Sequence, residues 1–355
     1  MPHANPSPID PPSKVVVTGA NGFIGCHATS MLLKRGYNVI AVVRSQGKAD
    51  LVQQMHSKTT PECDHLLTTA IIPDITSQEA FTSLFEAHRP AAILHLASPF
   101  TYATTNFEED LLKPAVRGTE AVLQAAAQSP SVHRIVQTNS FACIYDAAKG
   151  PRPGYTYTSK DWCPLSYEDG VKAPNAPVAY RASKAVAEKT AWKFMDTPRG
   201  FDLVSLCPAM VFGPFLEGAL PGSLKELNTS NQLVWDVVSA GEQGSVPPTK
   251  GPVWIDVRDV AEAHVKALED PSLGGTRKML AKGVYCSQEI ADVARSVAPK
   301  QQHRIPIGEP GSRAADTHFA VDASAEEKQF GPKWRTLEET LGDLLPQLYQ
   351  IEANA

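Results

Sequence analysis

The chain has 355 residues, a formal net charge of −5 and 20% charged residues. This length allows a large buried core, either as one α/β unit or as a nucleotide-binding domain with a smaller lobe. The charge excludes a basic surface for nucleic acid or an anionic membrane, and the sequence has no 18-residue apolar run that would predict a membrane span.

The N-terminal segment and the cysteines indicate the cellular compartment. Residues 1–13 are polar and proline-rich, so they predict a disordered extension rather than a signal peptide. The six cysteines lie far apart and form no Cys-x-x-Cys motif, which is typical of thiols in a reducing cytosol. The histidines have no metal-ligand spacing. We therefore expect a cytoplasmic protein without a metal site. The oligomeric state, monomer or homodimer, stays open.

Patterns typical of strands and helices alternate along the first 207 residues. The predicted strands begin at Lys14 and then cover 38–43, 66–72, 91–97, 134–138 and 201–207. The predicted helices cover 23–35, 46–58, 77–88, 107–128 and 179–195. This alternation predicts an α/β fold with a Rossmann-type, doubly wound parallel sheet and right-handed crossovers.

The alternation of predicted strands and helices is interrupted at two places. Residues 145–178 are rich in Pro, Gly, Tyr and Thr, and they predict a long connection across the top of the sheet. Beyond residue 207 the elements become shorter, until an amphipathic helix near 336–351. We expect a nucleotide-binding domain over 14–207 and a mainly substrate-binding lobe over 208–355, with segments that return to the sheet.

Three glycines separate the first strand from the first helix. Gly19, Gly22 and Gly25 follow the spacing Gly-x-x-Gly-x-x-Gly. A strand, a tight turn and a helix N-terminus present backbone N–H groups to a pyrophosphate. We expect Gly19 to allow the turn, Gly22 to let phosphates approach the backbone, and Gly25 to let the helix pack close to the strand. The loop therefore predicts a dinucleotide site.

The end of the second strand indicates which dinucleotide is bound. An NAD enzyme places Asp or Glu there, whereas Arg receives the 2′-phosphate of NADP. Here the chain has Arg44 and Lys48 and no nearby acid before Asp50, which favours NADPH. The alternative is a solvated basic pair. Asp74 and Ile75 follow the third strand and are placed to touch the adenine.

A Tyr–Lys pair at helical spacing predicts carbonyl chemistry. Reduction of a carbonyl needs a proton donor. A tyrosine serves if its pKa falls from about 10 toward neutrality, which requires roughly 4 kcal/mol. A lysine ammonium about 4 Å away supplies approximately that amount at an effective dielectric near 20. Tyr180 and Lys184 have the i, i+4 spacing in an Ala-rich helix. Tyr145 and Lys149 share it, but Pro151 follows and a stable helix is excluded.

Ser140 follows the fifth strand, at the sheet edge where ligands bind. Its hydroxyl can hold a substrate carbonyl and stabilise the developing alkoxide. The alternative role is a turn or helix cap, which serine often provides. Placement at the strand end favours the catalytic role.

Together these motifs resemble the extended short-chain dehydrogenases/reductases. More narrowly, the chain resembles fungal NADPH-dependent methylglyoxal reductases and aldehyde or ketone reductases, which are related to plant dihydroflavonol 4-reductase. The blocks that carry the resemblance are Gly19-Ala20-Asn21-Gly22-Phe23-Ile24, Arg44-Ser45-Gln46, Pro73-Asp74-Ile75, Ala97-Ser98-Pro99-Phe100, Asp110-Leu111-Leu112, Tyr180-x-x-Ser183-Lys184, Val211-Phe212-Gly213-Pro214, Leu227-Asn228-Thr229-Ser230, Ile255-Asp256-Val257-Arg258-Asp259-Val260-Ala261 and Ile305-Pro306-Ile307-Gly308.

The resemblance implies an oxidoreductase that reduces a small ketone or aldehyde with NADPH, with Ser140, Tyr180 and Lys184 as the catalytic residues. Lys184 would hold the nicotinamide ribose and acidify Tyr180. The implied cofactor contacts are Gly19, Ala20, Asn21, Gly22, Phe23, Ile24, Arg44, Lys48, Asp74, Ile75, Tyr180, Lys184, Val211 and Ser230.

The chain departs from the family pattern just before Ser140. The family usually has two serines at this strand end, whereas here Asn139 precedes Ser140. The N-terminal extension is additional. Substrate and stereochemistry stay open, because pocket positions are only loosely shared. Candidate pocket walls, for which core packing is an equal alternative, are Phe100, Phe141, Tyr145, Trp162 and Met210.

Two other functions are compatible with this fold. Nucleotide-sugar epimerases and dehydratases have the same Tyr–Lys pair, but they hold NAD tightly, and Arg44 opposes that interpretation. A non-enzymatic NADP-sensing regulator would have no need for a proton donor, so an intact Ser140, Tyr180 and Lys184 argue against it. A reductase is therefore the preferred prediction.

Overall fold

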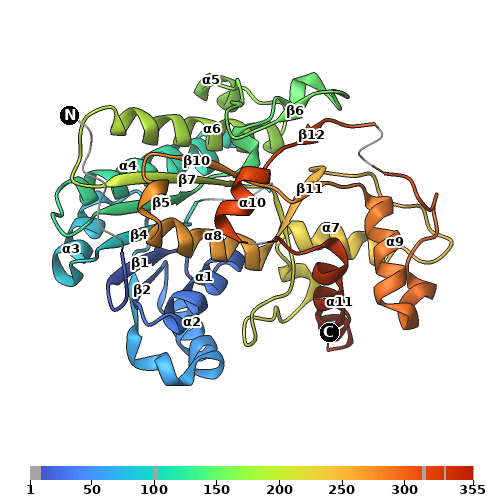
Figure 1. Cartoon of the computed structure of the whole chain (residues 1–355), viewed down its shortest axis with the longest axis horizontal. Helices are drawn as coiled ribbons and strands as arrows, with labels where there is room; N and C mark the ends of the chain where they lie inside the picture. The colour runs from blue at the N-terminus through green and yellow to red at the C-terminus, as the bar shows by residue number, and fades with distance from the viewer. Residues whose placement is uncertain (1–8, 99–102, 314–316, 332, 355) are drawn as a thin grey trace. The chain divides into compact units, whose positions relative to one another are not determined.

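The computed structural model describes residues 9–98, 103–313, 317–331 and 333–354, and Figure 1 shows its course. The strands are β1 (Lys14–Thr18), β2 (Asn38–Val43), β3 (Leu67–Ile71), β4 (Ala92–His95), β5 (Arg134–Thr138), β6 (Thr156–Tyr157), β7 (Asp202–Pro208), β8 (Met210–Phe212), β9 (Val253–Asp256), β10 (Arg277–Leu280), β11 (Gly283–Val284) and β12 (Ala320–Val321). The α-helices are α1 (Phe23–Lys34), α2 (Gln46–Thr59), α3 (Gln78–His88), α4 (Lys113–Ala127), α5 (Tyr167–Val171), α6 (Ala176–Met195), α7 (Thr229–Val238), α8 (Val257–Glu269), α9 (Ser287–Val297), α10 (Ser324–Phe330) and α11 (Leu337–Ala353).

The chain divides into two units. Unit 1 consists of Met1–Asp146, Ser159–Cys207 and Ala261–Lys278, and unit 2 consists of Ala147–Thr158, Pro208–Val260 and Met279–Ala355. One segment differs from the expected division. Residues 147–158 belong to unit 2, where β6 pairs in parallel with β12, although they lie within the range expected for the nucleotide-binding domain.

Unit 1 is built on a seven-stranded sheet with the order β10-β7-β5-β4-β1-β2-β3. The pairings of β1 with β2 and β4, of β2 with β3, and of β5 with β4 and β7 are all parallel. The chain runs outward from β1 to β3 on one side and from β4 to β7 on the other. The prediction of a doubly wound, Rossmann-type sheet is confirmed, and its switch point lies between β1 and β4.

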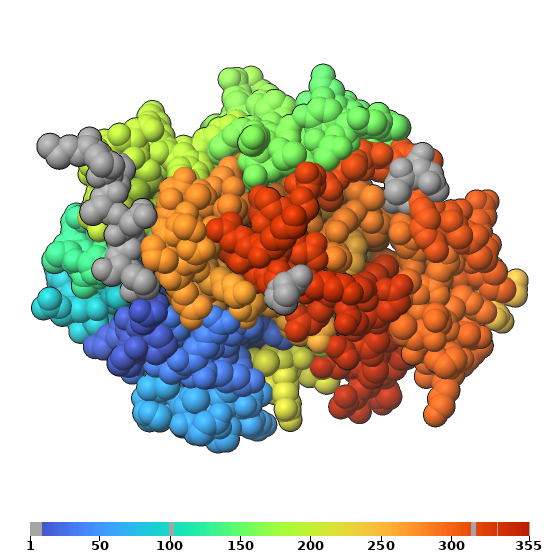
Figure 2. Space-filling model, viewed as in Figure 1, coloured from blue at the N-terminus to red at the C-terminus, as the bar shows by residue number. Residues whose placement is uncertain are grey.

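Helices cover both faces of this sheet. Figure 1 shows α3, α4 and α6 gathered on one face and α1 and α2 on the other. A core of aliphatic and aromatic side chains from β1, β2, β4 and β5 packs beneath α3 and α4. The returning segment Ala261–Lys278 joins the α1 face, where Arg35 forms ion pairs with Glu262 and Glu269. In Figure 2 this orange segment lies against the blue surface of the first helices.

Unit 2 has its own small sheets and helices. Its three-stranded sheet has the order β11-β9-β8, with β8 parallel and β11 antiparallel to β9. The Phe212 ring stacks on Trp254 at 6.1 Å and meets Tyr285 edge-on at 5.1 Å. Asn231 holds both the N–H and the C=O of Gly213, at 3.2 and 2.9 Å. The C-terminal helix α11 begins at a Thr336 capping box and covers the predicted helix 336–351.

Some sequence predictions need correction. The extension does not stay disordered over residues 9–13, because Ile9 is buried and its carbonyl accepts a 2.6 Å hydrogen bond from the Tyr37 hydroxyl. Residues 1–8 lie outside the described residues. The helix predicted over 107–128 begins as a π-helical turn, Glu108–Leu112, before α4. Helix α6 begins three residues before 179, because Asn175 caps it and Pro177 occupies its first turn.

Candidate active site

The glycine loop lies at the switch point of the unit 1 sheet. Gly19 follows β1 with φ +68°, which L side chains rarely adopt, and its N–H donates to the Val42 carbonyl at 3.1 Å. A Cβ at Gly19 would lie 3.1 Å from the backbone nitrogen of Ala97, which follows β4. The turn therefore needs glycine both for its conformation and for the close approach of the two strand ends.

The third glycine lets α1 approach this turn. A Cβ at Gly25 would lie 2.2 Å from the Gly19 carbonyl oxygen. Gly22 is the N-cap of α1, its N–H donates to Gly19 at 2.9 Å, and the first turn carries no acidic residue. The first N–H groups of α1 thus emerge next to two glycines, Gly19 and Gly22, which have no side chain to shield the backbone. This arrangement fits a pyrophosphate, and it gives Gly19 and Gly25 the roles expected of them.

A second helix N-terminus carries the two predicted cations. Arg44 directly follows β2 and is exposed, and Lys48 lies in the first turn of α2. Within the described residues neither forms an ion pair. The first turn of α2 holds no acidic residue, and Ser45 at its N-cap makes no capping bond with the described residues. Two cations and free amide groups suit a phosphate ester.

Asp74 and Ile75 follow β3 at the same edge of the sheet. Asp74 Oδ1 accepts hydrogen bonds from both the backbone N–H and the hydroxyl of Thr76, each at 2.8 Å. These bonds lower the pKa of the Asp74 carboxyl, so the group stays ionised at neutral pH. Ile75 packs against Gly118 of α4, where a Cβ would meet the Ile75 side chain at 3.0 Å. The backbone of Ile75 therefore lies close to α4.

Tyr180 and Lys184 lie in the first half of α6, one turn apart. Tyr180 is partly exposed, while Lys184 is buried. Burial lowers the pKa of Lys184, against the opposing effects of the Cys143 and Cys207 thiols and the Glu188 carboxylate. An ammonium with little solvent around it exerts a strong field on a neighbouring charge. The i, i+4 spacing places both side chains on the same side of the helix.

Ser140 stands where β5 ends and a 3₁₀ turn, Phe141–Cys143, begins. Its Oγ accepts a 3.1 Å hydrogen bond from the Ala142 N–H, so the capping role is present. Because the Ser140 oxygen only accepts in this bond, its hydroxyl proton can still be donated to another group. The 3₁₀ turn lies against α6, which brings the Ser140 segment to the helix that carries the Tyr–Lys pair.

A small cavity joins Lys184 to the ends of β4 and β5. Lys184 lines it together with His95, Ser98, Gln137, Thr138 and Asn139. His95 was not singled out from the sequence, although its place at the end of β4 is a signal that could have found it. Thr18 Oγ1 lies 3.0 Å from His95 Nδ1. Burial, with the Lys184 charge, lowers the pKa of His95 to about 4, so its ring is neutral at pH 7.

Unit 2 brings together the two remaining residues that the resemblance implied. The N–H of Val211 on β8 donates to the Ser230 hydroxyl of α7 at 3.2 Å. The side chain of Ser230 thus fixes the backbone at Val211.

The residues predicted to line the substrate pocket make different kinds of contact in the structure. Phe141 stacks on Tyr145 at 5.2 Å with the rings nearly parallel. Trp162 is 40% exposed and covers the Arg277 guanidinium at 3.8 Å. Met210 borders Gly251 within unit 2, and Phe100 lies outside the described residues. Tyr145 lies between two short 3₁₀ turns, Phe141–Cys143 and Ala147–Lys149, so no single helix spans Tyr145 and Lys149.

The described residues contain no group of three or more His, Cys, Asp and Glu side chains that could hold a metal ion. Of the helices they form, none has both the length and the apolar character needed to cross a bilayer.

Comparisons with known proteins agree with this geometry. A family model described as the NAD dependent epimerase/dehydratase family matches residues 15–281. The chain is 35% identical over 350 residues to the NADPH-dependent methylglyoxal reductase GRE2 of Saccharomyces cerevisiae, covering 95% of this chain and 98% of the relative. It is 31% identical over 341 residues to the ketoreductase azaE of Aspergillus niger, covering 95% and 98%. The crystal structure of yeast methylglyoxal/isovaleraldehyde reductase Gre2 complexed with NADPH gives a TM-score of 0.88 at 33% identity, covering 96% of this chain and all of that one.

Proposed function

Because this chain belongs to the NAD-dependent epimerase/dehydratase family, we propose that it is an NADPH-dependent reductase that converts a small ketone or aldehyde into an alcohol. The observation that carries the proposal is the buried Lys184, which shares a cavity with the ends of β4 and β5 and lies one turn from Tyr180. The names of the relatives, a methylglyoxal reductase and a ketoreductase, support the substrate class.

The residues of unit 1 fit the cofactor. The loop with glycine at positions 19, 22 and 25 suits the pyrophosphate, and α1 adds its N-terminal N–H groups. Arg44 and Lys48 are assigned to the 2′-phosphate, and Asp74 and Ile75 to the adenine. The resemblance adds Val211 and Ser230 of unit 2 to the proposed cofactor contacts, and a hydrogen bond joins these two residues to each other.

The three catalytic residues have separate tasks. When bound, the reduced nicotinamide supplies the hydride. Ser140 donates its hydroxyl proton in a hydrogen bond to the carbonyl oxygen and holds that oxygen in place. Tyr180 gives its phenolic proton to the same oxygen as negative charge develops there. The Lys184 ammonium stabilises the phenolate that remains, and the buried position strengthens this effect.

The basic end of β2 separates a reductase from an NAD-recycling epimerase of the same family. An enzyme that keeps NAD bound through an epimerisation uses a carboxylate at this position to hold the ribose hydroxyls. Arg44 stands there instead. We also place the enzyme in the cytoplasm, and the six free thiols, four of them buried, support this location.

The test measures NADPH oxidation with methylglyoxal, simple diketones, aryl ketones and larger aldehydes, followed by identification of the product alcohol. The wild-type protein is compared with Tyr180→Phe, for which we expect kcat to fall by about 10²- to 10⁴-fold. Tyr167→Phe is the matched control, because it also removes a partly exposed hydroxyl, which binds Glu108 at 3.1 Å. Near-normal turnover by a folded Tyr180→Phe protein would refute the assignment.

A further inference from the structure

Asn139, the residue before Ser140, is tied into the core of unit 1. Its side chain is buried, and its Nδ2 donates to Ser205 Oγ at 2.8 Å. Its backbone N–H donates to the Leu206 carbonyl at 2.7 Å. The Ser205 hydroxyl in turn donates to Glu188 Oε1. A chain of hydrogen bonds therefore runs from the end of β5 through β7 to a carboxylate on α6.

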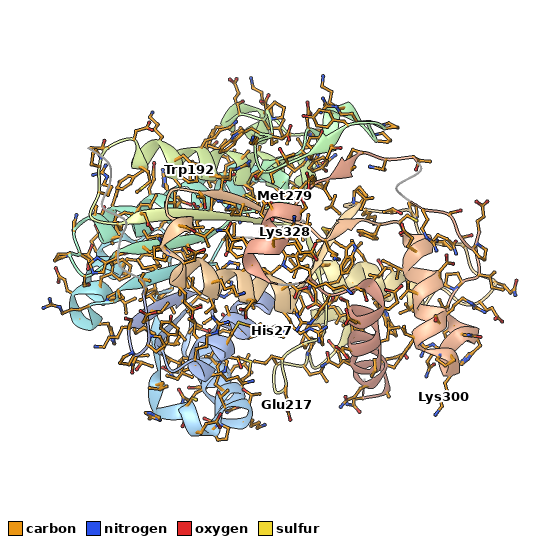
Figure 3. All side chains as sticks on the ribbon, in the orientation of Figure 1. His27, Trp192, Glu217, Met279, Lys300 and Lys328 are labelled. Atoms are coloured by element: carbon orange, nitrogen blue, oxygen red, sulfur yellow. The ribbon has the colours of Figure 1, made fainter. Side chains whose placement is uncertain are left out.

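That carboxylate has several hydrogen-bond partners. Glu188 lies one turn beyond Lys184 and is fully buried. Arg277 binds it with two hydrogen bonds, Nε to Oε1 at 2.8 Å and Nη2 to Oε2 at 2.9 Å. Trp192, labelled on α6 in Figure 3, brings its indole Nε1 to 3.5 Å from Oε1. A two-point ion pair of this kind fixes the orientation of the carboxylate as well as its position.

The guanidinium of Arg277 also holds the chain that follows Ser140. Its Nη2 donates to the Cys143 carbonyl at 3.0 Å, at the end of the 3₁₀ turn that Ser140 opens. Its Nη1 donates to the carbonyls of Ser159 and Asp161, both at 2.7 Å. The backbone on both sides of Ser140 is thus connected to one buried ion pair.

We propose that Glu188 is a positioning residue that sets the distance between Ser140 and the Tyr–Lys pair. Glu188 shares α6 with Tyr180 and Lys184, and through Ser205 it holds the strand end on which Ser140 stands. This inference rests on the role of Ser140 in the proposed function. The side-chain amide of Asn139 connects the end of β5 to Ser205 and so to Glu188. This connection gives a structural role to Asn139, which stands where the family usually has a serine.

Asn139→Ala tests the proposal, because it breaks the link while leaving the ion pair intact. We expect kcat to fall at least tenfold with the Kd for NADPH unchanged, since small misplacements of a catalytic group are costly. Ser205→Ala breaks the same link independently and should give the same result. In a Ser140→Ala background, Asn139→Ala should change kcat less than twofold, because the group it positions is absent.

The control separates positioning from general loss of stability. Tyr37→Phe removes another fully buried hydroxyl of unit 1, which donates to Ile9 at 2.6 Å, and it should leave kcat unchanged. Normal kcat in Asn139→Ala and Ser205→Ala, or equal losses with and without Ser140, would overturn the positioning role while leaving the proposed function intact. Normal turnover by Ser140→Ala would instead contradict the role of Ser140 in the proposed function, and the positioning role with it.

Discussion

Gly25 and the carbonyl oxygen of Gly19 approach so closely that a Cβ on Gly25 would lie 2.2 Å from that oxygen. The neighbouring atom belongs to the backbone of a turn whose φ of +68° already requires glycine. Neither partner can therefore move away as the end of a flexible side chain would. The contact brings α1 against β1 and so places the first N–H groups of the helix at the switch point.

Gly25→Ala should consequently weaken both the fold and the cofactor site. We expect the free energy of unfolding to fall by about 2 kcal/mol, as for an overpacked core, and NADPH binding to be lost. Gly342→Ala is the control, because this glycine lies inside α11 with no atom near its Cβ position, and the change should be neutral or stabilising by about 0.5–1 kcal/mol. Urea unfolding and NADPH titration measure both effects. A Gly25→Ala protein that binds NADPH normally would contradict this account of the loop.

Arg44 should determine the choice of cofactor. Arg44→Asp removes a charge-assisted hydrogen bond to the 2′-phosphate and places a like charge beside it, so we expect NADPH to bind about 100-fold more weakly. The Kd for NADH should change little or improve. Lys58→Gln, an exposed lysine in the last turn of the same helix α2, serves as the control. Equal losses for the two cofactors would show that Arg44 acts on the fold rather than on the phosphate.

The Arg277–Glu188 pair should be costly to break because both groups are buried. Arg277→Met leaves the carboxylate without its partner, and we expect the free energy of unfolding to fall by about 3–5 kcal/mol. Lys172→Gln breaks an ion pair whose two side chains are 73% and 74% exposed, and it should cost less than about 0.5 kcal/mol. Chemical denaturation of both variants checks the contrast. If Arg277→Met lowers the free energy of unfolding by less than about 1 kcal/mol, the ion pair does not stabilise the folded protein as proposed.

The sequence predicted the parts of the fold that follow from local patterns. The strand over 38–43 matches β2 in both of its bounds, and that over 134–138 matches β5, because buried parallel strands are short apolar runs bounded by polar residues. The helix over 46–58 differs from α2 by one residue. The roles expected of Gly19 and Gly25 could also be derived, since tight turns and close helix packing leave few alternatives to glycine.

The relationships that were not predicted depend on long-range contacts. Nothing in the residues around Glu188 reveals that Arg277, 89 positions later, is its partner. For the same reason the seventh strand, β10, was not predicted, and although a return of C-terminal segments to the sheet was expected, residues 261–278 were not identified as the segment that joins unit 1. The cap at Ser140 was foreseen as an alternative role, and the structure shows that a hydroxyl can accept the capping bond and keep a proton for a substrate.

His56 in α2 is a buried polar group whose two ring nitrogens have no hydrogen-bond partner among the described residues. Burial, with a smaller effect of the Lys34 charge, lowers the pKa of His56 to about 4 from its usual value of 6.5. Above pH 6.5 the ring is neutral in both the folded and the unfolded chain. Between pH 6.5 and 4 only the unfolded chain binds the proton, so stability falls as the pH falls through this window.

His56→Leu should therefore stabilise the protein, and more so in acid. Removing an unpartnered buried group should add about 1 kcal/mol to the free energy of unfolding at pH 7. At pH 5 the gain should grow by about a further 2 kcal/mol, because the variant no longer loses stability through protonation of the unfolded chain. Unfolding in urea at both pH values measures the difference. His65→Leu, an exposed histidine just beyond the same helix, should change stability by less than about 0.5 kcal/mol. An equal gain for His56→Leu at both pH values would show that His56 has the same pKa in the folded and the unfolded chain, which would contradict this account.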